Sequence, residues 1–341
     1  MKQIRTKEIS VKTQIGPAPA NGATVLLVCQ RKVFGGGLWP KAGVLALLLG
    51  TGLLTAVGQT NQPQYRFIEI AVPGPSEALG INDNGLITGA YVNPDTGGWT
   101  SFVLDRGDLT TGIEIHGAAD TVLGPANIWG VESGNFGNET NQRPVFRDIR
   151  SGTYAPLPEI PGLPYNNDNG INDFGHAVGV AYASGDINSG GNGIGSNWFW
   201  NGRDYSFFTV PGSEVNGASV GGLNDWDQIS GYYVDGAGTP HGFIKNGKSY
   251  TTLDVPGANF TLAFAINNRG EVPGLYQDAS GYHGFLWSHG KYFTVDTDIA
   301  GADGVEWIGI NDNGDLAGFA ELTTDAGTVQ TAVIALRLDE K

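Results

Sequence analysis

The chain of 341 residues contains only one cysteine, Cys29. The residues that follow it therefore cannot form a disulfide, bind a metal through a thiolate or use a cysteine nucleophile. Positive charge is also scarce, because 19 Lys and Arg residues stand against 34 Asp and Glu residues. A nucleic-acid partner is not expected, since binding to phosphates needs a positive surface.

Long apolar runs are missing too, with one exception near the N-terminus. Residues 42–58 carry no charge, follow a basic flank that ends at Lys41, and finish in Ala56-Val57-Gly58. This pattern predicts a secretory signal peptide over residues 1–58, and hence a secreted or cell-surface protein, extracellular or periplasmic. The alternative is an uncleaved anchor, although the run is short for a membrane span. An exported protein that begins near Gln59 would rule out the anchor.

Loss of residues 1–58 would make the chain more acidic. Seven bases and one acid would leave with them, so that 12 bases and 33 acids remain, a net charge of −21. Such a protein is not expected to bind nucleic acid or anionic membrane surfaces, or to be embedded in a membrane.

Glycine, by contrast, is abundant, and one phrase recurs with a period in the forties. The phrase is Gly or Ala, an aliphatic residue, Asn, and a turn that closes in Gly or Asp. It occurs at residues 80–85, 170–175, 222–227, 265–270 and 309–314. Such self-similarity is typical of repeat architectures.

Six units emerge when the glycine near the end of each second strand is taken as a register mark. The marks lie 41 to 52 residues apart, at Gly89, Gly130, Gly179, Gly231, Gly274 and Gly318. The second unit, around residues 128–131, is predicted to keep the strand but to lack the Asn-Gly turn. The third unit carries an insertion at residues 184–197, rich in Gly, Asn and Ser.

Turn signals divide each unit into four short strands. In the fourth unit the first strand should end at Leu223, and the others should span residues 228–234, 241–245 and 250–255. Asn246-Gly247 is a hairpin signal between the last two. Small antiparallel sheets of this kind bury both faces when they stack radially. The sequence therefore predicts an all-β, six-bladed β-propeller over residues 65–341, after a linker at residues 59–64.

The two ends of the chain support a closed ring. The last unit lacks a fourth strand, and residues 67–72 near the N-terminus resemble the fourth strand of the other units. Residues 67–72 are therefore expected to pair with residues 331–338 and to complete the last blade.

Two units carry the motif His241-Gly242-Phe243 or His283-Gly284-Phe285 after an acidic loop. Together with the Gly-Ile-Asn and Val-Pro-Gly-Ala phrases, these motifs resemble the repeats of the bacterial extracellular-repeat family named HAF, after His-Ala-Phe. The resemblance spans about residues 65–340 and implies a secreted bacterial β-propeller, but no catalytic residues. Here His-Gly-Phe replaces His-Ala-Phe, and only two of the six units carry the histidine.

The longer loops should share one face of the propeller, opposite the tight hairpins, and long loops on a rigid scaffold often bind ligands. That face is expected to hold His116, His241, His283, Asp235 and Asp278. The favoured hypothesis is an extracellular binding or scaffold protein whose ligand sits there, with a carbohydrate as one candidate. In this hypothesis His241 and His283 fix their own blades, while His116 departs from its repeat pattern. The alternative is a secreted hydrolase or lyase for a carbohydrate or small metabolite, with His and Asp groups at the channel mouth.

Other motifs point to ordinary structure. The Asn-Asp-Asn-Gly turns lack the donors of a calcium loop, and Ser219 sits in a nucleophile-elbow pattern with no helix after it. No metal or cofactor is therefore predicted. Trp99 and Trp226 lie in or beside loops, where exposed aromatic rings next to carboxylates would suit stacking on sugar rings. Most of the seven tryptophans after residue 58 are instead expected to pack between blades.

Overall fold

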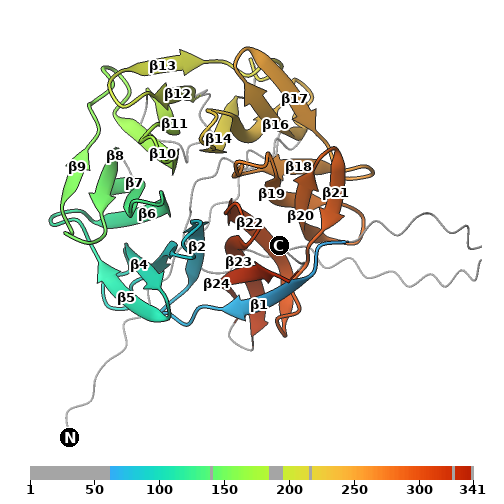
Figure 1. The fold of residues 1–341 in the computed structure, drawn as a ribbon, viewed down its shortest axis with the longest axis horizontal. Helices are drawn as coiled ribbons and strands as arrows, with labels where there is room; N and C mark the ends of the chain where they lie inside the picture. Colours follow the sequence, from blue (N-terminus) through green and yellow to red (C-terminus); the bar gives the residue numbers. More distant parts are fainter. Residues whose placement is uncertain (1–61, 139–140, 184–194, 215–216, 325–326, 339–341) are drawn as a thin grey trace, which may run out of the picture.

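The structure is a computed structural model that describes residues 62–138, 141–183, 195–214, 217–324 and 327–338. The predicted signal peptide over residues 1–58 and most of the predicted insertion, residues 184–194, lie outside the described residues. The described chain forms six four-stranded antiparallel sheets around a central axis (Figure 1). The prediction of an all-β, six-bladed propeller is confirmed. None of the described residues belongs to a helix that could cross a membrane.

Each blade runs from an inner strand at the channel to an outer strand at the rim (Figure 1). Blade 1 consists of β2 (Ser76–Ile81), β3 (Ile87–Val92), β4 (Trp99–Asp105) and β5 (Asp108–Ile113). Blade 2 consists of β6 (Asp120–Ala126), β7 (Val131–Asn138), β8 (Asn141–Asp148) and β9 (Tyr154–Pro156). Blade 3 consists of β10 (Tyr165–Ile171), β11 (Ala177–Tyr182), β12 (Ser196–Trp200) and β13 (Tyr205–Phe208). Blade 4 consists of β14 (Ala218–Leu223), β15 (Ile229–Val234), β16 (Pro240–Asn246) and β17 (Ser249–Leu253). Blade 5 consists of β18 (Phe260–Ala263), β19 (Val272–Gln277), β20 (Tyr282–Ser288) and β21 (Lys291–Thr294). Blade 6 consists of β22 (Ala302–Ile310), β23 (Leu316–Thr324), β24 (Gly327–Arg337) and β1 (Tyr65–Glu69).

Blade 6 contains both ends of the described chain. β1 pairs antiparallel with β24, and this pairing places Phe67 opposite Ala335 and Glu69 opposite Val333. The strand that precedes the first blade in sequence thus forms the outer strand of the last blade, at the position expected from the sequence.

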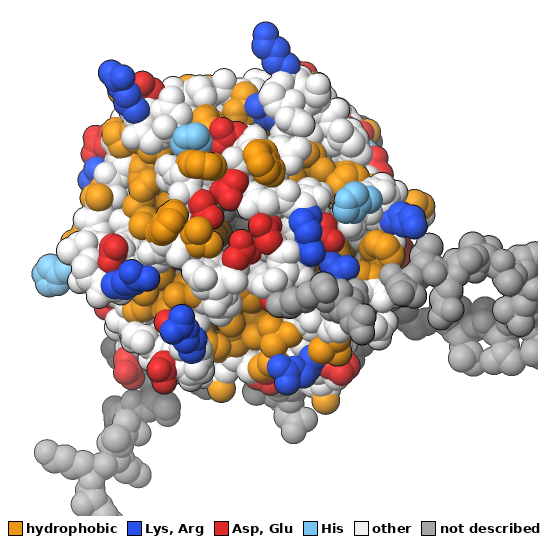
Figure 2. Space-filling view, viewed as in Figure 1, with side chains coloured by type: hydrophobic (Ala, Val, Ile, Leu, Met, Phe, Trp, Pro, Cys, Tyr) orange, Lys and Arg blue, Asp and Glu red, His pale blue; other side chains and the backbone are white. Residues whose placement is uncertain are grey.

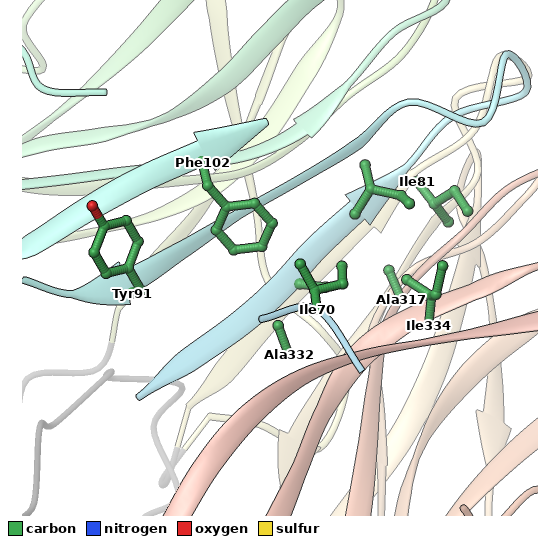
Figure 3. Packing of buried hydrophobic residues seen from close by; sticks show 9 residues of the cluster. Ile70, Ile81, Tyr91, Phe102, Ala317, Ala332 and Ile334 are labelled. Carbon is green, nitrogen blue, oxygen red and sulfur yellow. The ribbon is translucent and has the colours of Figure 1, made fainter. Parts of the chain in front are cut away.

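The hydrophobic core lies between the blades. Figure 3 shows how buried side chains of blade 1, among them Ile81 and Phe102, face Ala317 and Ile334 of blade 6. Similar clusters of buried side chains lie across the other blades. Each small sheet therefore buries both of its faces against its neighbours, as a ring of blades requires.

The second unit differs from its prediction in two respects. Its register glycine is Gly134, which pairs with Leu123 and Val145 as Gly231 pairs with Val220 and Phe243. At Gly134 and Gly231 a Cβ atom would collide with a carbonyl oxygen of the inner strand, so only glycine fits. The unit also keeps its turn, which runs from Asn127 to Gly130. The repeated phrase is altered in this unit, because Pro-Ala precedes Asn127 where the other units have Gly or Ala and an aliphatic residue.

Candidate functional site

The repeated asparagine starts the same turn between the first and second strands of every blade. In blade 4, the Asn224 Oδ1 atom accepts the backbone N–H groups of Trp226 and Gln228 at 3.1 and 3.0 Å. The fourth turn residue, Asp227, has a φ of +55°, where the other five turns have glycine with φ between +75° and +83°. Asparagine stands at this position because its side-chain oxygen can accept the backbone N–H groups of its own turn.

The same asparagine also joins neighbouring blades. Its Nδ2 group donates to the backbone oxygen of the equivalent asparagine in the next blade, at 2.9–3.2 Å. These six hydrogen bonds form a ring whose buried members are Asn82, Asn127, Asn172, Asn224, Asn267 and Asn311. The last bond runs from blade 6 to blade 1. The phrase that the sequence repeats is therefore a connection between blades as well as a hairpin turn.

The second turn residue forms a further ring, at the channel mouth. Its members in blades 1 to 6 are Asp83, Ile128, Asp173, Asp225, Asn268 and Asp312. Backbone N–H groups donate to the Oδ1 atom of the next member at 2.6–2.9 Å, in the five places where that member is Asp or Asn. We call the four carboxylates the acidic ring. Figure 2 shows acidic side chains gathered around the centre of this face. The turns line a channel cavity of about 100 Å³.

The third turn residue is an exposed aromatic side chain in three consecutive blades. Trp129, Phe174 and Trp226 are 62%, 70% and 72% exposed, which makes them the most exposed large hydrophobic residues of the described chain. We call these three residues the aromatic arc. In Figure 2 hydrophobic side chains lie beside the acidic centre, on the side of blades 2 to 4.

Contacts with the next blade hold the two tryptophans of the aromatic arc in place. The indole N–H of Trp129 donates to the backbone oxygen of Asp173 at 3.0 Å, and that of Trp226 donates to Asn268 at 3.3 Å. The Phe174 ring lies 6.2 Å from the imidazole of His176, a residue of its own blade, and the His176 Nδ1 atom is 2.8 Å from the Asp227 Oδ1 atom. The two indoles are therefore oriented before a ligand binds, which lowers the entropic cost of binding.

The acidic ring carries charges that oppose one another. Partial burial raises the pKa of Asp83, and the charges of Asp312 and Asp173 raise it further. Burial likewise raises the pKa of Asp173, with added repulsion from Asp225 and Asp312. The Asn268 Nδ2 group donates to Asp225 and Asp312 at 2.8 and 2.9 Å, and so offsets part of this repulsion.

His241 and His283, singled out from the sequence, lie away from the acidic ring, each beside acids of its own blade. The His241 Nδ1 atom is 2.7 Å from Asp254, its Nε2 atom is 3.4 Å from Asp235, and its ring stacks on Tyr233. The backbone N–H of Thr239 lowers the pKa of Asp235.

His283 repeats this arrangement in blade 5. Its Nδ1 atom is 2.9 Å from Asp296, its Nε2 atom is 3.5 Å from Asp278, and its ring stacks on Tyr276. Ser280 donates to Asp278 and lowers the pKa of that carboxyl. No hydrogen bond or ion pair among the described residues links the two histidines, and His116 is exposed in the segment between β5 and β6.

Other blades place a different polar pair at the position of His241 and Asp254. In blade 1 the Thr100 hydroxyl donates to Glu114 at 2.6 Å, and in blade 2 Arg143 lies 3.2 Å from Glu159. A cross-strand polar pair is thus a recurring feature of the blades. Among the described residues, no three His, Cys, Asp or Glu side chains are placed to hold a metal ion. Ser219 lies within β14, and Trp99 is only 7% exposed.

Comparison with known proteins finds the fold alone. No protein-family model and no curated protein matches the chain. Among solved structures, a gluconolactonase from Xanthomonas campestris superposes with a TM-score of 0.51 at 10% identity, over 82% of this chain and 95% of that one. The β-propeller domain of the Trilobed protease from Pyrococcus furiosus gives a TM-score of 0.47 at 11% identity, over 78% and 84% of the two chains. TolB from Acinetobacter baumannii gives 0.46 at 13% identity, over 71% and 60%. At such identities the likeness supports the propeller fold and no particular activity.

Proposed function

We propose that this protein is an extracellular binding protein whose ligand lies on the aromatic arc at the channel mouth. The observation that carries the proposal is the aromatic arc itself, since three neighbouring blades expose Trp129, Phe174 and Trp226 at one turn position. Exposed aromatic side chains gathered on one surface mark interaction sites, and Trp is among the residues that contribute most to binding.

The contacts of the histidines favour binding over catalysis. An acid/base site requires different groups that converge on one substrate. His241 and His283 instead occupy equivalent positions in blades 4 and 5, and each contacts acids of its own blade. This arrangement supports a role in fixing the loops of each blade.

The proposed site lies on the face of the short hairpins, whereas the sequence analysis favoured the face of the long loops. Export through the predicted signal peptide and membership of the HAF repeat family are part of the proposal. Both rest on the sequence patterns described above.

A ligand panel with an intrinsic fluorescence readout tests this function, because Trp129 and Trp226 are exposed and report on their surroundings. Cellohexaose, chitohexaose and a hexa-arginine peptide are each titrated into the full-length protein. At least one ligand should quench or shift the emission, and Trp226→Ala should weaken its binding by about tenfold or more.

Phe207→Ala is the matched control, because Phe207 is an aromatic residue of β13, 52% exposed and outside the channel mouth. This variant should bind as the wild type does. A panel without any response contradicts the proposal, and so does binding that survives Trp226→Ala or that falls equally in Phe207→Ala.

A further inference from the structure

We propose that the ligand of this site is a positively charged polypeptide segment, whose arginine or lysine side chains lie on the aromatic arc and against the acidic ring. This inference rests on the proposed function and names the chemical class of its ligand.

The first argument is that the backbone hydrogen bonds of the ring do not require charge. Asn268 occupies the ring position in blade 5, and its Oδ1 atom accepts the N–H of Asp225 at 2.8 Å, just as the Oδ1 atom of Asp225 accepts the N–H of Asp173 at 2.9 Å. The second carboxylate oxygens of Asp225 and Asp312 also accept from the Asn268 Nδ2 group. The fold therefore accounts for these two acids but does not explain the acids at Asp83 and Asp173.

The second argument is that the charge is costly to the folded protein. Burial and mutual repulsion raise the pKa of Asp83 and Asp173, so their ionised forms are disfavoured in the folded state. Repulsion within a ring of like charges is relieved when a cation approaches it. Groups held in a disfavoured state at a channel mouth are typical of ligand sites.

The third argument is the position of the aromatic arc beside the ring. Trp226 follows Asp225 directly in the chain, and the Trp129 indole donates to the backbone of Asp173. Guanidinium and ammonium groups are attracted to the faces of indole and phenyl rings, and more strongly where carboxylates stand nearby. A neutral sugar could stack on the same rings, but it would leave the repulsion of the acidic ring uncompensated.

The fourth argument is the shape of the site, which favours a chain over a small cation. The channel cavity, of about 100 Å³, admits little more than the end of one side chain. The aromatic arc, in contrast, extends over three blades, and its rings are too exposed to enclose a small molecule. An extended segment can contact the arc and the ring together, and the acidic protein would attract it from a distance.

The test compares two fluorescein-labelled peptides, hexa-arginine and hexa-citrulline, by fluorescence anisotropy with the full-length protein. Citrulline has nearly the shape of arginine but no charge. Hexa-arginine should bind at least tenfold more tightly than hexa-citrulline. Binding should weaken several-fold between about 0.05 and 0.5 M NaCl, because salt screens the attraction.

Two protein variants with equal changes in net charge separate the acidic ring from general attraction. The ring variant carries D83N and D173N, at the two ring acids that take no hydrogen bond from Asn268. The control variant carries D95N and D105N, at two exposed acids that do not line the channel cavity. The ring variant should lose at least tenfold in affinity for hexa-arginine, and the control variant less than threefold.

The outcomes also separate this inference from the proposed function. Equal losses in the two variants, or equal binding of the two peptides, contradict a cationic ligand for this site. If cellohexaose or chitohexaose binds and Trp226→Ala abolishes that binding, the site is real but its ligand is a carbohydrate, and only the inference fails. If Trp226→Ala changes the binding of no ligand, both the inference and the proposed function fail.

Discussion

Glu132 shows how far a single residue can depart from the pattern of its repeat. The equivalent positions in blades 1, 4 and 5 hold Ile87, Ile229 and Val272. Glu132 is fully buried and forms an ion pair with Arg147, while its Oε2 atom has no hydrogen-bond partner. Burial raises the pKa of Glu132 to about 7, although Arg147 opposes the shift.

Glu132→Gln should therefore change how stability depends on pH. A folded-state pKa above the unfolded value of 4.5 means that the wild type loses stability as pH rises from about 4.5 to about 7. Between pH 4.5 and 7.5 the free energy of unfolding of the wild type should fall by about 3 kcal/mol more than that of Glu132→Gln. Urea denaturation at pH 4.5, 6 and 7.5 measures this difference. Glu159→Gln, at an exposed ion pair, should keep the wild-type profile. Parallel profiles for wild type and Glu132→Gln would refute the assignment.

At the scale of the element, the turn between the first and second strands links local sequence to the ring of blades. Asn224 is 4% exposed; its Oδ1 atom accepts two N–H groups of its own turn, and its Nδ2 group donates to Asn267 of the next blade. Stability should depend on this residue more than on an asparagine that serves a local turn alone.

Asn224→Ala should lower the free energy of unfolding by about 2–4 kcal/mol, because it leaves buried backbone groups without partners. Asn201→Ala is the matched control. The Asn201 Oδ1 atom accepts two N–H groups of the exposed turn between β12 and β13, and within the described part of the chain Asn201 makes no hydrogen bond to another blade. The control should lose less than about 1 kcal/mol in the same urea titration. Similar losses in the two variants would show that the bonds between blades contribute little.

The strands of blade 4 could be predicted from sequence because their signals are local. The expected third strand at residues 241–245 falls within β16 (Pro240–Asn246), and Asn246-Gly247 marks the hairpin that follows. The bonds between asparagines could not be predicted in this way, since five of them join residues about one repeat apart and the sixth joins Asn311 to Asn82, which are 229 residues apart. The prediction that blade 2 lacks the asparagine turn was wrong, because its turn follows Pro125-Ala126-Asn127 and not the Gly-aliphatic-Asn phrase of the other units.

At the scale of the whole molecule, the candidate site arises from the ring and from no single blade. Each turn contributes at most one carboxylate to the acidic ring and one side chain to the aromatic arc, and only the six-fold arrangement gathers them at one mouth. The relevant signal was present in the sequence, as an acid in the second turn position of four units and an aromatic in the third position of three. The sequence prediction favoured histidines because imidazole can act as an acid or a base, but His241 and His283 occupy equivalent positions in two separate blades.

The central claim is that the charge of Asp83 and Asp173 in the acidic ring serves a ligand and not the fold, and thermal unfolding of the ring variant tests it most directly. The ring variant, with D83N and D173N, keeps an acceptor for every backbone N–H of the ring and leaves the bonds of Asn268 to Asp225 and Asp312 intact, while it loses part of the repulsion among the carboxylates. Its Tm at pH 7 should equal that of the wild type or exceed it by about 1–4 °C. A Tm several degrees below that of the wild type would show that the carboxylates stabilise the propeller, and would contradict the account.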